Sequence, residues 1–378
     1  MADLGPTSDY LIAQWEVRTM TARLDHLSDD LLRRAARHQL AEAAVTATYA
    51  LSPGSATAAL AALGFATVGP TGLIAQAVAL RATAAALISA QQLMLAADDA
   101  VAAGLPLAES VAGAAIQALD AGAPGRALLG TYAGTEGVPS LALTGTVRGE
   151  TGPHRLSDLL LRLDTVNRMP DGTIQIQAIT GADGRRRFVV YLPGTDAFDR
   201  GAVRSWPANA SIRLGAPTTY EAGIVEAMTA AGVGPRDPVL LVGHSQGGMV
   251  AAEMARHRGP FTISQVVTAG SPIGDRPPPP TTGLIALEHT GDPVPGLDGT
   301  PGRSTPGARG SAPQTTLRFG DGLTTPLAAH GLGHYVAGAR TAEESTDPSV
   351  RRAVAGVREF LGGRSDETTT WVISRAAA

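Results

Sequence analysis

Residues Val239 to Ala255 read VLLVGHSQGGMVAAEMA. The apolar run at the start of this stretch predicts a buried strand, and the apolar residues after Gly248 recur at helical spacing. Between them lies Gly243-His244-Ser245-Gln246-Gly247, a G-x-S-x-G pentapeptide typical of a sharp turn from a strand into a helix. Such a turn requires small neighbours, exposes the Ser245 hydroxyl at the sheet edge and directs helix N–H groups at negative charge that forms there. The stretch therefore predicts a nucleophilic Ser245 rather than a plain glycine-rich turn.

The composition of the 378-residue chain is that of a globular protein, with 44% hydrophobic and 17% charged residues. The net charge is −4 and the basic residues are scattered, so no nucleic-acid surface is indicated. The chain has no cysteine, which excludes disulfides, thiolate catalysis and cysteine-bound metals. The first residues do not form a basic segment followed by an apolar core, so we expect no secretory signal and a cytoplasmic location.

From about residue 151 onward, short apolar strands alternate with helical segments. The expected strands are 173–180, 188–192, 239–242, 263–268, 284–287, 315–319 and 369–373, and the expected helices are 218–231, the segment after Ser245, and 332–361. This alternation predicts an α/β domain over residues 151–378, with a mostly parallel sheet and helices on both of its faces.

Residues 1–125 are Ala-rich and predict an all-α region, and the Gly-rich residues 126–150 predict a linker. We expect one helix to begin near Ser8 and a second to run from Ser28 to the break at Ser52-Pro53-Gly54. Beyond Pro70, apolar residues recur every seven positions, at Leu73, Leu80, Leu87, Met94 and Val101. These patterns predict antiparallel helical hairpins packed as a bundle.

Residues 43–80 carry no charged side chain, a stretch long enough to span a membrane. Most of them are Ala, Thr and Gly, which insert poorly, and Gly64, Gly69 and Pro70 interrupt the middle. We therefore expect a soluble bundle, with contact to a membrane surface as the alternative.

A nucleophilic serine needs a base, and the base needs a carboxylate that orients it. Asp292 follows the apolar run 284–287 and lies between Gly291 and Pro293, so we favour it as the carboxylate over a residue that only starts a turn. The alternatives are Glu288 and Asp298.

Two histidines are candidates for the base. His330 lies in the loop before the last predicted helix, where its ring can reach Ser245, and His334 lies in the first turn of that helix. We favour His330 and keep His334 as the alternative, while His244 is interpreted as structural.

Acyl transfer by a serine also needs hydrogen-bond donors for the oxyanion that forms. The N–H of Gln246, next to the serine, is one candidate. The other is expected from Pro193-Gly194-Thr195-Asp196, the loop after the strand 188–192, and the choice between Thr195 and Asp196 stays open. The sequence contains no metal-binding cluster or phosphate-binding loop, so no cofactor is expected.

Together these motifs resemble the α/β-hydrolases of the lipase/esterase type, and specifically the class 3 lipase pattern. The likeness covers about residues 173–345 and includes Pro193-Gly194-Thr195, the serine pentapeptide, Gly270-Ser271-Pro272, Asp292-Pro293-Val294-Pro295 and a histidine near the C-terminus. It implies an α/β-hydrolase fold and a serine ester hydrolase whose triad is Ser245, Asp292 and His330.

Related actinobacterial hydrolases have their histidine five residues before a tyrosine, which is the spacing of His330 and Tyr335. Pro193 replaces the family's usual basic residue, and we expect no lid helix between Leu192 and Thr218. These departures favour hydrolysis of small-molecule or lipid esters over activity on aggregated fat.

The N-terminal region is similar, in length and Ala-rich texture, to the helical-hairpin modules of type VII secretion substrates. Tyr132 and Glu136 have the Tyr-x-x-x-Glu spacing of that pathway's signal, but Trp15 is followed by Glu16 and Val17 rather than by a Trp-x-Gly turn. The resemblance implies an alternative in which the chain is exported, binds a secretion-system or helical partner, and uses the α/β domain as a scaffold.

Overall fold

The computed structural model describes residues 8–47, positions 59–60, 62–63, 66–67, 72–74 and 76–77, and residues 137–376 apart from 197–201, 258, 293, 299–311 and 323–325. The described residues fall into two units, one ending at residue 77 and the other beginning at residue 137.

The described part of the N-terminal unit includes the long helix α1 (Ser8–Ala47). The expected helix start at Ser28 is wrong, because Ser28 is buried within α1 and its hydroxyl donates to the main-chain oxygen of Ala77 at 3.0 Å. Thr67 Oγ1 lies 3.4 Å from His38 Nδ1, so α1 also contacts Thr67. The break at 52–54, the seven-residue repeat beyond Ala77, and Tyr132 and Glu136 lie outside the described residues. Among the residues that are described, no helix is long and apolar enough to cross a membrane.

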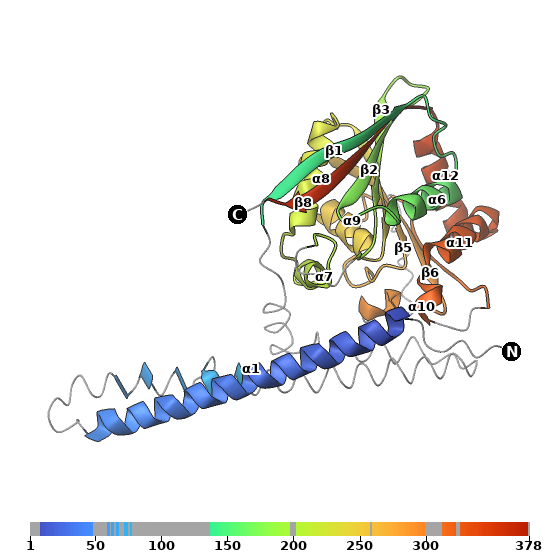
Figure 1. Cartoon of the computed structure of the whole chain (residues 1–378). Coiled ribbons are helices and arrows are strands. Elements are labelled where there is room, and N and C mark those ends of the chain that lie inside the picture. The colour runs from blue at the N-terminus through green and yellow to red at the C-terminus, as the bar shows by residue number, and fades with distance from the viewer. Residues whose placement is uncertain are drawn as a thin grey trace. The chain divides into compact units, whose positions relative to one another are not determined.

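The second unit is built on one eight-stranded sheet (Figure 1). Its strands are β1 (Pro139–Arg148), β2 (Thr173–Thr180), β3 (Arg186–Leu192), β4 (Pro238–His244), β5 (Thr262–Ala269), β6 (Gly283–His289), β7 (Gln314–Phe319) and β8 (Arg364–Arg375). They lie in the order β1-β8-β2-β3-β4-β5-β6-β7. Strands β3 to β7 are parallel, and β1, β8, β2 and β3 pair antiparallel.

Helices cover both faces of this sheet (Figure 1). One face packs against α6 (Leu156–Asn167), α11 (Leu332–Glu344) and α12 (Pro348–Leu361) through an apolar core that includes Leu160, Val242 and Val357. The other packs against α7 (Trp206–Arg213), α8 (Thr219–Ala230) and α9 (Gln246–Arg256) through a core that includes Leu241 and Ile224. Two short helices, η1 (Pro295–Asp298) and α10 (Pro326–Ala329), lie in loops. The predicted α/β class, with a mostly parallel sheet between helices, is confirmed.

Three details of this unit differ from the expectation. Part of the expected linker 126–150 is strand β1, which pairs with β8 along the edge of the sheet, so the α/β unit includes residues before 151. The expected helix 332–361 is two helices, because Asp347 caps α12 by accepting from the N–H groups of Ser349 and Val350. The interval between Leu192 and Thr218, where no lid helix was expected, contains the helix α7.

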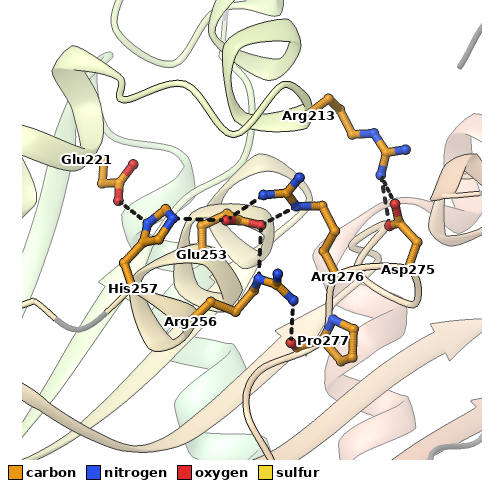
Figure 2. A network of polar contacts seen from close by, with 8 residues as sticks. All are labelled: Arg213, Glu221, Glu253, Arg256, His257, Asp275, Arg276 and Pro277. Carbon is orange, nitrogen blue, oxygen red and sulfur yellow. Dashed lines mark hydrogen bonds and ion pairs between the residues drawn. The ribbon is translucent and has the colours of Figure 1, made fainter.

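A polar network joins the helices on the α9 face (Figure 2). The nearly buried carboxylate of Glu253 on α9 accepts from Arg276 Nε at 2.5 Å and Nη2 at 2.9 Å. In the same network Arg213, the last residue of α7, donates to Asp275 at 2.8 Å, and His257 lies between Glu221 of α8 and Glu253. The loop after β5 is therefore tied to α9 and α7, which holds in place the helix that follows Ser245.

The parallel half of the sheet determines where the site forms. Strands β3 to β7 run in the same direction, so the loops that follow them all emerge at one edge. Ligand and active sites of open α/β sheets lie at this carboxyl edge.

Candidate active site

Ser245 lies in the sharp turn between β4 and α9, with φ of 49° and ψ of −116°. It is the one non-glycine residue with positive φ among those described, and strained residues of this kind cluster at functional sites. Its N–H donates to the main-chain oxygen of Ala269 at 2.9 Å. The turn needs its glycines, because a Cβ at Gly247 would lie 1.9 Å from the oxygen of Leu192 and one at Gly243 would lie 2.4 Å from Gly247.

The loops after β6 and β7 bring Asp292 and His330 together. His330 Nδ1 lies 2.7 Å from Asp292 Oδ2. The Asp292 side chain is fully buried, whereas the His330 side chain is 19% exposed. Because Nδ1–H donates to the carboxylate, the other ring nitrogen of His330 keeps a lone pair that can take a proton.

The Asp292 carboxylate has two further donors. The N–H of Val294 donates to Oδ1 at 2.9 Å, and the hydroxyl of the buried Tyr335 donates to Oδ2 at 2.5 Å. Burial and the neighbouring Asp292 raise the pKa of Tyr335 above its usual range, so the phenol keeps its proton and remains a donor. The sequence singled out Tyr335 only by its spacing from His330.

His334 is paired with a different carboxylate. Its Nδ1 contacts Oδ2 of Asp321, whose Oδ1 lies 2.9 Å from Nε2 of the buried His289. Burial favours the neutral acid, but the hydrogen bonds from His334 and His289 outweigh it and lower the pKa of Asp321. Asp292 is thus brought to His330 and not to His334, the alternative base. The alternative carboxylate Glu288 pairs with Arg318 at 3.0 Å.

His244 connects the serine turn with His330. Its Nε2 lies 3.0 Å from the main-chain oxygen of His330, and the two ring centroids are 4.6 Å apart. Burial, followed by the neighbouring His330, lowers the pKa of His244 to about 3, so its ring is neutral near pH 7. Ser245 is therefore one residue from a side chain in contact with His330. The pattern of the pentapeptide carries no signal for this contact.

Two glycines allow these parts to approach closely. Gly194 follows β3, and a Cβ there would lie 3.2 Å from Cβ of Ser245. Gly270 follows β5 with φ of 61°, and a Cβ there would lie 2.9 Å from both Asp292 Oδ2 and the Tyr335 hydroxyl. Larger residues at either position would separate the serine turn from the groups around it.

The loop Pro193-Gly194-Thr195-Asp196 is held on several sides. The N–H of Gly194 donates to Asn167 Oδ1 at 3.0 Å, and Asn209 Nδ2 donates to Thr195 Oγ1 at 3.0 Å. The N–H of Asp196 donates to the main-chain oxygen of Arg204 at 2.9 Å, so this donor is already used within the loop. Thr195 is therefore the better oxyanion candidate of the two.

Arg204 is a side chain of this loop region that the sequence did not reveal. It is fully buried, its Nη1 donates to the oxygen of Gly194 at 2.9 Å, and its Nη2 lies 3.2 Å from Asp196 Oδ2. The carboxylate of Asp171 accepts from the main-chain N–H groups of Val203 and Arg204, so it holds the segment that carries Arg204. No local sequence pattern marks a buried arginine of this kind, because the groups that neutralise it come from other loops.

Gln246 begins α9 directly after the serine. Its side-chain Nε2 donates to the main-chain oxygen of Ser205 at 2.9 Å, which fixes the first turn of the helix. The N–H groups of a helix's first turn have no acceptor within the helix, so the N–H of Gln246 suits an anionic oxygen beside Ser245.

The site thus combines a strained serine, a carboxylate-bound imidazole and main-chain donors at one sheet edge. Within the described ranges, no group of three or more His, Asp or Glu side chains is arranged to hold a metal ion. Comparisons with protein-family models, curated proteins and solved structures find no match to the chain.

Proposed function

We propose that this chain is an α/β-hydrolase that cleaves carboxylic esters through an acyl-enzyme. The observation that carries the proposal is the strained Ser245 at the end of β4, next to a His244 that contacts His330, which in turn is bonded to Asp292. A serine on such a turn, a base and a carboxylate that orients the base are the parts that serine hydrolysis requires.

In the proposed reaction, Ser245 Oγ attacks the ester carbonyl and its proton passes to the free ring nitrogen of His330. Asp292 stabilises the imidazolium that forms. The N–H groups of Gln246 and Thr195 stabilise the negative oxygen, and each such donor contributes about 2.7–4 kcal/mol to lowering the barrier.

When the tetrahedral intermediate collapses, the C–O bond to the alcohol breaks and His330 gives its proton to the departing alcohol oxygen. Water then attacks the acyl-serine, with His330 taking the water proton and returning one to Ser245 Oγ. The products are a carboxylic acid and an alcohol, and the reaction needs no cofactor.

The substrate class is a small-molecule or lipid ester. Helix α7 occupies the interval in which a lid was not expected, and its Asn209 bonds to Thr195 of the proposed oxyanion loop. Because α7 is tied to this loop, we propose that it forms one wall of the substrate site rather than a detached cover.

The test is hydrolysis of p-nitrophenyl esters of increasing acyl length by the wild-type chain and by Ser245→Ala. We expect the variant to lose about 10³-fold or more in kcat/KM, because the nucleophile is removed. Labelling with a fluorophosphonate checks the same serine, since wild type should react and Ser245→Ala should not. A folded wild type that neither hydrolyses the esters nor takes up the label would contradict the proposal and favour a scaffold or partner-binding role.

A further inference from the structure

His244 contacts three parts of the candidate site. It is the last residue of β4, directly before Ser245, and its ring packs on the ring of His330 with 4.6 Å between the centroids. On another side, a Cβ at Gly194 would lie 2.8 Å from His244 Nδ1, so the loop after β3 also contacts this ring. The residue is 7% exposed and is fixed by a central strand.

The hydrogen bond from His244 to His330 determines which ring nitrogen carries the hydrogen. Nε2 lies 3.0 Å from the main-chain oxygen of His330, and a carbonyl oxygen can only accept. Nε2 therefore donates, and Nδ1 of the neutral ring carries a lone pair. Nδ1 is buried and has no hydrogen-bond partner within the described part of the chain.

A buried lone pair without a partner costs stability, and an apolar ring would fill the same space without that cost. The polar ring at position 244 is therefore explained by the hydrogen bond that its Nε2 makes to His330. The acceptor of this bond belongs to the loop between α10 and α11, which carries the base.

His330 is thus held at two points. Asp292 fixes Nδ1 of its ring, and His244 fixes its main-chain oxygen. A ring held only by Asp292 can still pivot about that bond, and a displacement of about 1 Å at a reacting group can cost 10²-fold in rate.

We propose that His244 is a positioning residue that holds the main chain of His330 through its Nε2–H group, so that the free ring nitrogen of His330 faces Ser245. The inference rests on the proposed role of His330 as the base. His244 itself transfers no proton and contacts no substrate atom.

The test compares His244→Gln with His244→Asn, two neutral amides of different length. A glutamine amide nitrogen lies near the place of the histidine Nε2, whereas an asparagine amide nitrogen lies near the place of Nδ1. We expect kcat to fall about tenfold or more in His244→Asn and to stay within about threefold of wild type in His244→Gln, with KM changed little in both. If the two variants have the same melting temperature and the same kcat, the proposal is overturned, whether both keep the wild-type kcat or both lose it.

A second measurement needs neither turnover nor a variant that folds. Long-range heteronuclear NMR of nitrogen-labelled histidine in the wild-type chain at neutral pH should show His244 with its hydrogen on Nε2. A hydrogen on Nδ1 would overturn the proposal whether or not the chain hydrolyses esters. If the hydrogen is on Nε2 but the chain is inactive toward esters, the proposed function fails while the His244–His330 contact stands.

Discussion

Nδ1 of His330 lies 2.7 Å from Oδ2 of Asp292. This contact distinguishes His330 from His334, which is only four positions later in the chain. His334 is on the first turn of α11 and is paired with Asp321. The two pairs, His330–Asp292 and His334–Asp321, have similar chemistry, but only the first contacts the residue next to Ser245.

This arrangement predicts different effects for the two histidines. His330→Ala should lower kcat/KM for a short acyl ester by about 10³-fold or more, because the serine loses its base. His334→Ala should change kcat/KM by less than about tenfold, since His334 is paired with Asp321 and not with Asp292. The two variants are compared in the same ester assay after their folding is checked by circular dichroism, and a larger loss in His334→Ala would assign the base to His334.

Tyr335→Phe should destabilise the fold more than Tyr191→Phe does. Both phenols are buried, but Tyr335 donates to the Asp292 carboxylate at 2.5 Å, whereas Tyr191 donates to the neutral amide oxygen of Gln177 at 3.0 Å. A hydrogen bond to a charged acceptor contributes about 1.5–3 kcal/mol and a neutral one about 0.5–1.5 kcal/mol. Urea unfolding of the two variants measures the difference, and equal losses would show that the Tyr335 bond is no stronger than the neutral one.

Gly247→Ala should lower the free energy of unfolding by about 1–3 kcal/mol or more, because the new methyl would lie 1.9 Å from the oxygen of Leu192. Gly333→Ala is the control, since no heavy atom lies within 4 Å of a Cβ at that position of α11. The control should be neutral or stabilising by up to about 1 kcal/mol. Thermal unfolding tests both, and an unchanged melting temperature in Gly247→Ala would contradict the close packing of the serine turn.

The low pKa of His244 predicts a pH dependence of stability. The unfolded chain protonates this histidine below about pH 6.5, but the folded chain does not do so until about pH 3. Between these values the unfolded state binds more protons, so stability falls as the pH falls, by up to about 1.4 kcal/mol per pH unit from this group.

His244→Gln removes the titrating ring, so its free energy of unfolding should fall less steeply than that of wild type between about pH 6 and pH 4. Urea unfolding at several pH values gives both slopes. Parallel slopes would mean that His244 takes up a proton equally well in the folded and unfolded states.

Local signals in the sequence predicted much of the α/β unit. The residues of β2 are those expected, 173–180, and α8 begins where Thr218 accepts from the N–H of Glu221 at 3.1 Å. The parallel strands were recognisable as apolar runs because both faces of the sheet are covered. Asp347-Pro348 is a helix-start signal that was visible in the sequence and explains why the last expected helix divides in two.

The features that the sequence did not predict depend on contacts between positions far apart in the chain. His244 and His330 are 86 residues apart, and the periodicity of neither segment indicates that they meet. The buried Arg204 and the hydrogen bond from Ser28 to Ala77 are of the same kind. A residue pattern reports which face of an element is buried, but the identity of the group on the other side is determined by the tertiary fold.

Strand β8 lies between β1 and β2 and pairs with both, whereas β1 and β2 do not pair with each other. During synthesis β8 is the last of the described strands to leave the ribosome, so β1 stays without its neighbour until nearly the whole unit has been translated. The pairs that β8 makes with β1 and β2 must therefore form after Ser245, Asp292 and His330 have been translated, and a nascent chain interrupted before Arg364 leaves the edges of β1 and β2 that β8 covers open to chaperones and proteases.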